Sequence, residues 1–149
     1  MTELRAMCQA AGFAKVRTYI ASGNVVFEAD RPEAAVKTAL ESALETYARK
    51  PIAVAIRTGP EMAAILAANP FALAPPNRTM AIFLDKPPPA DALAEVTGRQ
   101  DERVALGARE IYVHYPSGMA NSKLKIPVAR LGTARNMNTV ATLSEWAAT

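Results

Sequence analysis

Residues 3–29 of this 149-residue chain read ELRAMCQAAGFAKVRTYIASGNVVFEA, and they carry the clearest secondary-structure pattern of the chain. Leu4, Cys8 and Ala11 recur at helical spacing on one apolar stripe, so the stretch begins with a helix. The residues after it alternate and are rich in β-branched and aromatic types, which is typical of strands. The Ser-Gly-Asn sequence at residues 22–24 divides this part in two, as a tight turn or a bulge. The stretch therefore predicts a helix followed by two strand segments.

The chain then continues with a second helix, a third strand and a connecting helix. Asp30 and Glu33 are spaced as an aspartate variant of the capping box, which predicts a helix start. Residues 52–58 place Ile, Val and Ile in alternation, which predicts a strand. Thr58 and Glu61 bracket the start of the connecting helix.

A Pro-rich connection at residues 71–77 is the best candidate for a domain boundary. We therefore predict a first subdomain over residues 1–70, which includes the connecting helix, and a second over residues 71–149. The elements expected in the second subdomain are a strand within 79–85, a short helix at 90–96, strands near Arg103–Leu106 and Glu110–Tyr115, a short helix around Ile126–Leu131 and a last helix that begins near Asn138.

The order of these elements favours an α+β fold built from two ferredoxin-like (α/β-plait) halves. The first half reads αββαβ, which is the split βαββαβ unit without its opening strand. The second reads βαββ before two closing helices, and so lacks or rearranges its closing strand. Because the first strand of this plait lies inside the sheet, its absence predicts a gap with unpaired backbone groups along two neighbouring strands. We expect something to fill the gap, and self-association through it is one way.

The composition is that of an ordinary globular protein. Half of the residues are apolar, 21% are charged and the formal net charge is +3, a mild excess that does not by itself call for nucleic acid. No apolar run approaches the ~20 residues that span a bilayer, and no charged-then-apolar leader precedes the first helix. We therefore expect no membrane partner and a cytoplasmic location.

The sequence also excludes several kinds of catalytic or cofactor site. Cys8 is the only cysteine and His114 the only histidine, which rules out an intrachain disulfide and a zinc site. Cys8 is expected to be a buried, inert thiol. Tyr112 and His114 share one face of a strand but do not match an RNA-binding aromatic pattern. No glycine pattern of a P-loop or dinucleotide site and no carboxylate pair is present in the polar motifs, so we expect no cofactor and no bound metal, and the catalytic residues stay unassigned.

Three stretches together resemble one known family. They are the opening stretch, REIYVHYPSGMANSKLK at residues 109–125 and LGTARNMNTVATLSEWA at residues 131–147. In this order they are similar to the bacterial domain-of-unknown-function family 1697, and the similarity covers essentially the whole chain. The resemblance implies a two-subdomain α/β-plait protein and no particular activity.

The chain departs from this family's pattern at two places. The family usually opens with a strand and a Gly-rich turn, and this element is absent ahead of Met1. The expectation is a start codon assigned too far downstream or a trimmed chain, in agreement with the gap inferred from the element order. The second departure is Met137, where the family usually has Trp. If that Trp stacks on a ligand, a methionine weakens the aromatic platform.

Two stretches near the end of the chain concentrate polar and basic residues without apolar periodicity. The first ends in Ser122 and Lys123, and the second leads into the last helix. Free N–H groups at a helix N-terminus attract anions, and Arg and Lys side chains bind phosphate or carboxylate. The sequence therefore predicts a binding site for a phosphate-bearing ligand, either a nucleotide or nucleic acid. The candidate residues are Lys123, Arg135, Asn136, Asn138, Ser122, Thr133 and, if their loop packs against this face, Ser22 and Asn24.

Structural roles account for the same residues when they are taken one at a time. Asn138 is expected to cap the last helix, Arg135 could pair with a carboxylate, and residues 22–24 could form only a turn. Two other functions therefore stay open. One is an assembly protein without a ligand, and the other is an enzyme acting on a small phosphorylated or carboxylated substrate, with Lys123 or Ser122 in the chemistry. The enzyme requires a concave pocket between the halves.

Overall fold

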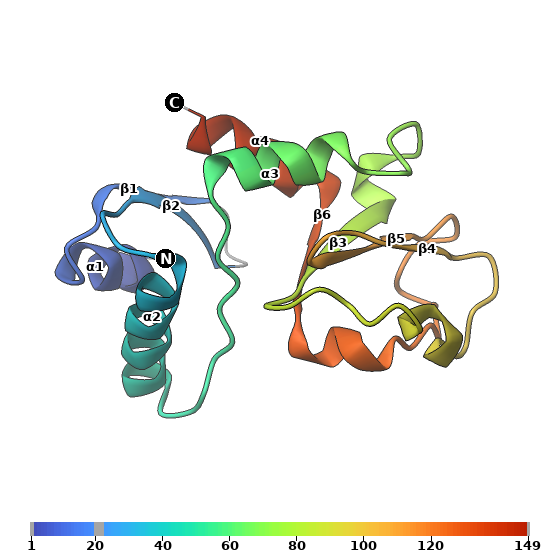
Figure 1. The fold of residues 1–149 in the computed structure, drawn as a ribbon, viewed down its shortest axis with the longest axis horizontal. Coiled ribbons are helices and arrows are strands. Elements are labelled where there is room, and N and C mark those ends of the chain that lie inside the picture. The colour runs from blue at the N-terminus through green and yellow to red at the C-terminus, as the bar shows by residue number, and fades with distance from the viewer. Residues whose placement is uncertain (1, 20–22, 149) are drawn as a thin grey trace.

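The computed structural model describes residues 2–19 and 23–148 and shows two halves joined by an extended segment (Figure 1). The first half is a two-stranded antiparallel sheet packed against two helices. Its elements are α1 (Thr2–Ala10), β1 (Ala14–Tyr19), β2 (Asn24–Glu28) and α2 (Glu33–Ala48). Their apolar side chains share one core, where the Phe13 and Phe27 rings stack with centroids 4.4 Å apart. Cys8 is fully buried there, as predicted, and burial raises the pKa of its thiol to about 11.

The prediction of a strand at residues 52–58 is wrong. These residues form an extended connection that pairs with no strand of the described chain. Their side chains nevertheless alternate, because Val54 and Ile56 pack into the first core whereas Ala55 packs against a core of the second half. The side-chain period of a strand is present, but a strand also needs a hydrogen-bonded neighbour, and the described residues supply none.

The second half is built on a four-stranded antiparallel sheet in the order β4-β5-β3-β6. The strands are β3 (Thr79–Phe83), β4 (Arg103–Leu106), β5 (Glu110–His114) and β6 (Thr133–Asn136). β3 pairs on both sides, with Ala81 opposite Tyr112 of β5 and opposite Arg135 of β6. The prediction that this half lacks or rearranges its closing strand is therefore wrong. The strand β6 was missed because its sequence, TARN, carries no large apolar side chain.

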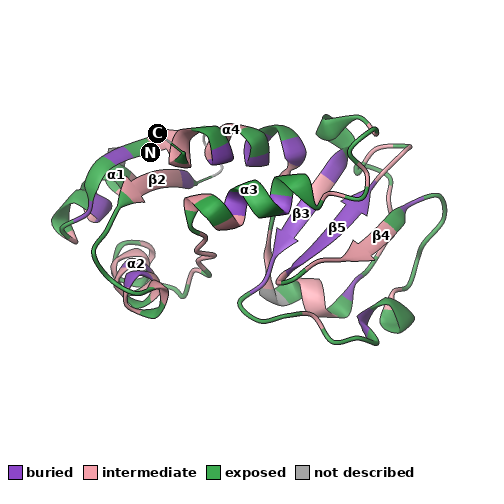
Figure 2. Ribbon diagram, turned by 45° about the horizontal axis from the view of Figure 1, so that its top comes forward, coloured by how far each residue is buried: buried purple, intermediate pink, exposed green. Residues whose placement is uncertain are grey.

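Two helices cover one face of this sheet, and the chain around two short 3-10 helices covers the other (Figures 1 and 2). The helices are α3 (Gly59–Ala67) and α4 (Met137–Ala147), and the 3-10 helices are η2 (Ala92–Glu95) and η3 (Pro127–Leu131). A third 3-10 helix, η1 (Pro76–Arg78), precedes β3 and contacts α4. Beneath the helices, the Tyr112 hydroxyl donates to the Ile65 carbonyl at 2.7 Å, and burial raises its pKa to about 12. On the opposite face Ile111 and Val113 pack with Ile126. Because side chains cover both faces, the described sheet offers no aromatic platform on which RNA bases could stack.

Helix α3 belongs to the second half by its packing. Met62 and Ile65 join a core with Ala81 and Val140, and α3 lies beside α4. The division at residue 70, which groups this connecting helix with the first half, stays a prediction. The apolar face of α3 packs on α4 and on the four-stranded sheet.

The two predicted capping boxes have different outcomes. The box at α3 is confirmed, because the Glu61 N–H donates to Thr58 Oγ1 at 3.2 Å and the Thr58 N–H donates to Glu61 Oε1 at 2.8 Å. The box predicted from Asp30 and Glu33 is wrong, because the cap of α2 has no side-chain hydrogen bond. The Glu33 carboxylate instead accepts two hydrogen bonds from Arg109, at 2.9 and 3.1 Å. The Glu33 carboxylate therefore binds a cation of the second half and not a backbone N–H at the start of α2.

Ion pairs hold the two halves and their connection together. Arg57 Nε lies 2.9 Å from Glu110 Oε2, and the two side chains are only 4% and 5% exposed. Beside them Arg109 binds Glu33 of α2 and Glu61 of α3, with N–O distances of 2.9 Å each. One guanidinium therefore joins both halves, and hydrogen bonds to these carboxylates raise its pKa.

Acid is expected to weaken this contact. The backbone N–H of Thr58 and the Arg109 guanidinium hold the pKa of Glu61 below the ordinary carboxyl value of 4.5. Because the folded-state pKa lies below the unfolded one, the carboxylate stabilises the fold above pH 4.5, and this contribution is lost as the pH falls through the folded-state pKa. Urea unfolding at stepwise lower pH should show a smaller loss of unfolding free energy in Glu61→Gln than in the unmodified protein. Equal losses in both proteins would contradict this role of Glu61.

Candidate functional site

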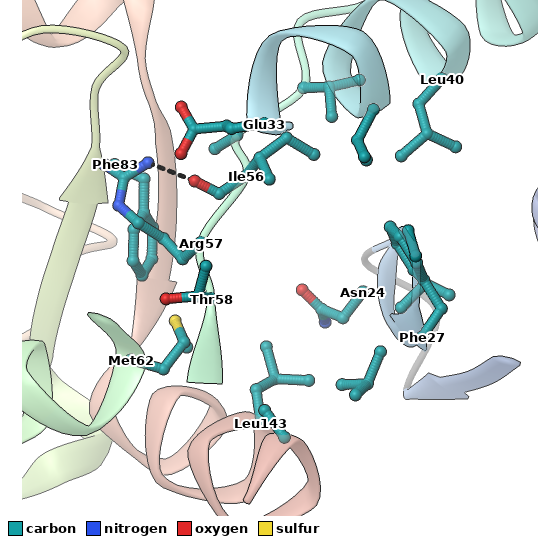
Figure 3. Close-up of a pocket in the computed structure, with 18 of the residues that line it drawn as sticks. Asn24, Phe27, Glu33, Leu40, Ile56, Arg57, Thr58, Met62, Phe83 and Leu143 are labelled. Carbon is teal, nitrogen blue, oxygen red and sulfur yellow. Dashed lines mark hydrogen bonds between the residues drawn. The ribbon is translucent and has the colours of Figure 1, made fainter. Parts of the chain in front are cut away.

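A cavity of about 1050 Å³ lies between the two halves (Figure 3). Its walls come from β1, β2, α2, the extended segment, β6 and the C-terminal part of α4. This is the concave pocket that an enzyme or a ligand-binding protein requires. Two kinds of surface meet in it, which we call the polar wall (Arg17, Asn24, Thr133, Arg135 and Trp146) and the apolar wall (Val25, Phe27, Leu40, Val54 and Ile56).

The polar wall brings together residues that are far apart in the sequence. Arg135 Nε donates to Asn24 Oδ1 at 2.6 Å, and Arg135 Nη1 donates to the Ala134 carbonyl at 2.8 Å. Asn24 is buried and in turn donates to the Tyr19 carbonyl at 3.1 Å. Thr133 precedes Arg135 by two residues on β6, so both side chains point to the same side of the sheet. Burial lowers the pKa of the Arg135 guanidinium, since removal of water disfavours its charge. An anion beside this desolvated cation would be attracted strongly.

A second cation of the polar wall lies over an indole ring. The guanidinium carbon of Arg17 is 3.9 Å from the centroid of the Trp146 ring, and Tyr19 contacts the same ring edge-on with centroids 5.2 Å apart. Sequence reasoning did not find Arg17 or Trp146 as site residues. Part of the signal was present, because Arg17 and Tyr19 are two apart and share one face of their strand. The local sequence could not say that the end of α4 covers that face.

The apolar wall is continuous with the core of the first half. Its residues come from β2, α2 and the extended segment, and they pack in the same cluster as buried Val36. In the close-up, Phe27 of β2 and Ile56 of the extended segment lie on opposite sides of the cavity (Figure 3). A pocket of this kind suits a ligand that combines an apolar body with an anionic group.

The structure does not bring Ser122 and Lys123 to this cavity. Ser122 Oγ donates to Glu102 Oε2 at 2.6 Å, just before β4, and this hydrogen bond is the main cause of a lowered Glu102 pKa. Lys123 is exposed. Because β4 and β6 are the two edges of the sheet, about three strand spacings of ~4.8 Å separate this pair from Arg135. The group of residues predicted from the sequence is therefore split between two places.

The residues around the start of α4 have structural roles. The prediction that Asn138 caps this helix is wrong, because Asn136 is the N-cap and its Oδ1 accepts from the Thr139 N–H at 2.9 Å. Asn138 is exposed, and Met137 is 2% exposed in the core, where it offers no surface to a ligand. Helix α4 lines the cavity with Leu143, Trp146 and Ala147 and not with its first turn, so an anion site at its N-terminus would lie apart from this cavity and stays a prediction. Ser22, also a predicted site residue, lies outside the described residues.

Other kinds of chemistry have little support in the described part of the chain. Within residues 2–19 and 23–148, no three His, Cys, Asp or Glu side chains are grouped to hold a metal ion. His114 is buried, with Nδ1 3.2 Å from Thr79 Oγ1, and neither His114 nor Cys8 lines the cavity. The helices in these same residues are all too short or too polar to cross a membrane.

A family model, that of Protein of unknown function (DUF1697), matches residues 1–112. The chain belongs to this family. The match confirms the resemblance inferred from the three sequence stretches. Asn24 of the polar wall lies within the matched residues, whereas Thr133, Arg135 and Trp146 lie beyond them. No curated protein matches this DUF1697 chain.

The fold is shared with a solved structure, that of the conserved bacterial protein SP0830 from Streptococcus pneumoniae. The two chains are 24% identical and superpose with a TM-score of 0.81, over 100% of this chain and 89% of that chain. At this identity the likeness shows a common mixed α/β fold and nothing about activity.

Proposed function

We propose that this DUF1697 chain is a binding module for a phosphate-bearing ligand, a nucleotide or nucleic acid, which it holds at the polar wall. The observation that carries the proposal is the hydrogen bond from Arg135 of β6 to Asn24 of β2, at 2.6 Å, on the wall of a cavity between the halves. The amide oxygen orients the guanidinium without neutralising it. The planar guanidinium matches the oxygens of a phosphate and binds them through charge-assisted hydrogen bonds.

The other charges around the cavity support an anionic ligand. Two of the lining carboxylates already have cationic partners, because Glu28 lies 3.4 Å from Lys15 and Glu33 lies 2.9 Å from Arg109. Arg17 adds a second guanidinium to the polar wall. The wall is therefore basic where the ligand would bind, which favours a phosphate over a cationic group.

The cavity is also the pocket that an enzyme would require. Ser122 and Lys123 were the residues proposed for its chemistry, and both lie near the opposite edge of the sheet. The polar wall itself contributes two guanidinium groups, an amide, a hydroxyl and an indole, and it includes none of the carboxylate, imidazole or thiol groups that commonly transfer protons in enzymes. Such a wall suits binding better than proton transfer, so the binding function is the one we favour.

The proposal includes an interpretation of the fold. The order β4-β5-β3-β6 supports a ferredoxin-like second half, with 3-10 helices in the places of its two helices. We infer that the first half is the same unit without its opening strand, since β2 and residues 52–58 line the same cavity and no strand of residues 2–19 and 23–148 lies between them. The division into residues 1–70 and 71–149 and a cytoplasmic location stay predictions.

Arg135→Gln is expected to weaken the binding of a phosphate-bearing probe by about tenfold or more, because a hydrogen bond to a charged group contributes roughly 1.5–3 kcal/mol. The probes are ADP, glucose 6-phosphate and a short single-stranded RNA, measured by isothermal titration calorimetry. Circular dichroism verifies that each variant is folded. Arg130→Gln is the matched control, because it removes an exposed cation of η3 that does not line the cavity.

Two results would count against this proposal. The first is that none of the three probes binds to the unmodified protein. The second is that Arg130→Gln loses as much affinity as Arg135→Gln, which would mean that only the general positive charge attracts the probe. Lys123→Gln adds a further comparison, since a site at the polar wall predicts unchanged affinity for this variant.

Assembly is the second candidate function, and the outer edge of β2 favours it. This edge pairs with no strand of the described residues, and an exposed strand edge is a template for pairing with another chain. Self-association through it should appear in sedimentation velocity as a dimer whose fraction rises with protein concentration. A monomer at every concentration would rule out this candidate.

A further inference from the structure

A second cavity, of about 570 Å³, is lined by the chain between α3 and β3 and by the neighbouring ends of β4 and β5. We call it the loop pocket (Phe71, Leu73, Pro75, Arg103, His114 and Pro116). It shares no lining residue with the cavity between the halves. Arg103 of β4 lies directly opposite His114 of β5, so the two side chains are neighbours on one face of the sheet. Pockets for small molecules ordinarily have volumes of about 300–1,000 Å³, so this one is large enough for such a ligand.

The hydrogen bonds of His114 fix which ring nitrogen carries the proton. Thr79 Oγ1 lies 3.0 Å from the Pro75 carbonyl oxygen and 3.2 Å from His114 Nδ1. A hydroxyl has a single hydrogen and a carbonyl can only accept, so the Thr79 hydroxyl donates to Pro75. The hydroxyl must then accept from Nδ1, which places the proton of the neutral imidazole on Nδ1. Nε2 is therefore left with a free lone pair.

The Nε2 atom of His114 is open to the loop pocket. His114 is 8% exposed, and within residues 2–19 and 23–148 no group forms a hydrogen bond with Nε2. Every fully buried side-chain nitrogen or oxygen in this part of the chain has a partner, so Nε2 is reached from the cavity that His114 lines. The Phe71 ring flanks the imidazole, with centroids 6.1 Å apart. A core histidine would have both nitrogens satisfied, whereas an acceptor held at the wall of a cavity suits a ligand site.

Arg103 determines the charge that the loop pocket prefers. Its guanidinium has no ion pair and no hydrogen bond among the described residues, and none of their carboxylates lines this pocket. The remaining lining is apolar, and it includes Leu73, which is fully exposed. A ligand carboxylate would pair with the guanidinium, and an apolar ligand group would cover Leu73.

We propose that the loop pocket binds a small α-hydroxy carboxylate with an apolar side chain. The carboxylate binds Arg103, and the adjacent hydroxyl donates to His114 Nε2. The apolar side chain packs against Phe71 and Leu73. An α-amino acid fits less well, because its ammonium would lie beside Arg103 with no lining carboxylate to balance the charge. The proposal does not depend on the phosphate-bearing ligand.

The test uses the whole chain and 3-phenyllactate, and its readout is the imidazole of His114, the only histidine of the chain. In proton–nitrogen correlation NMR at about pH 8.5, where free imidazole is neutral, Nδ1 should be protonated and Nε2 unprotonated. Added 3-phenyllactate should move the Nε2 signal in a saturable way. Three related probes should each bind about fivefold more weakly or worse. They are 3-phenylpropanoate, which lacks the hydroxyl, the methyl ester of 3-phenyllactate, which lacks the charge, and phenylalanine.

Two variants test the other contacts. Arg103→Gln should weaken the binding of 3-phenyllactate by about tenfold and Leu73→Ser by about fivefold. Both side chains are exposed, so stability should hardly change. The matched controls are Arg130→Gln and Leu93→Ser, which replace exposed residues outside the loop pocket. Circular dichroism verifies that each variant is folded.

Any of four results would overturn the proposal. They are a protonated Nε2 in the free protein, no movement of its signal with 3-phenyllactate up to about 10 mM, equal affinity for any of the three related probes, and equal losses in the variants and their controls. None of these results involves Arg135 or ADP. Failure at the loop pocket is therefore distinguishable from failure of the phosphate proposal.

Discussion

Arg57→Met is expected to lower the free energy of unfolding by about 3–5 kcal/mol, because it leaves a buried carboxylate without its cation. Arg57 and Glu110 are 4% and 5% exposed, with Nε and Oε2 2.9 Å apart. Arg57 Nη2 also donates to the carbonyls of Leu84 and Arg109, at 2.7 and 3.1 Å, and a methionine satisfies neither. Urea unfolding followed by circular dichroism measures the loss.

The control for this prediction is a double-mutant cycle, in which the same unfolding measurement is made on Glu110→Met and on the double variant Arg57→Met/Glu110→Met. Removal of either partner alone leaves a buried charge, whereas replacement of both leaves none, so the double variant should recover much of the lost stability. A double variant as unstable as the sum of the two single variants would show that the groups are not coupled. Because Arg57 belongs to the extended segment and Glu110 to β5, this coupling measures how much their ion pair contributes to holding the extended segment against the second half.

The elements predicted correctly are those with local signals. The strand at Arg103–Leu106 has the predicted bounds, and the one beginning at Glu110 ends one residue early. The capping box of Thr58 and Glu61 forms as its spacing indicates. In each case the residues that carry the signal are close in sequence, so the signal needs no knowledge of the rest of the fold.

The elements predicted wrongly depend on partners that are distant in the sequence. Residues 52–58 have the alternation of a strand but no neighbouring strand, whereas residues 133–136 have no apolar alternation but pair with β3. Whether an extended segment becomes a strand depends here on backbone pairing more than on side-chain pattern. The α2 cap failed for a similar reason, since its carboxylate binds Arg109 from the other half.

The candidate site could be predicted only in part. Arg135 and Asn24, which were both predicted, meet at the cavity although 111 residues separate them. Arg17 was missed, because its importance comes from the end of a helix more than a hundred residues later. Ser122 and Lys123 were grouped with Arg135 by their nearness in sequence, but the chain crosses from one edge of the sheet to the other between them.

Met137→Ala is expected to lower the free energy of unfolding by about 2–5 kcal/mol and to leave the affinity for a phosphate-bearing probe unchanged. Met137 is 2% exposed and packs with Met62 and Val140 beneath α4, so an alanine there leaves a cavity in the core. Asn138→Ala is the matched control, because this neighbouring residue is exposed and its change should stay within about 0.5 kcal/mol. The opposite result, weaker binding at unchanged stability, would mean that residue 137 is part of a ligand platform. If Met137→Ala loses stability but keeps its affinity, residue 137 does not contact the ligand. The ligand would then bind where Arg135 lines the cavity, on the other side of the point where β6 joins α4.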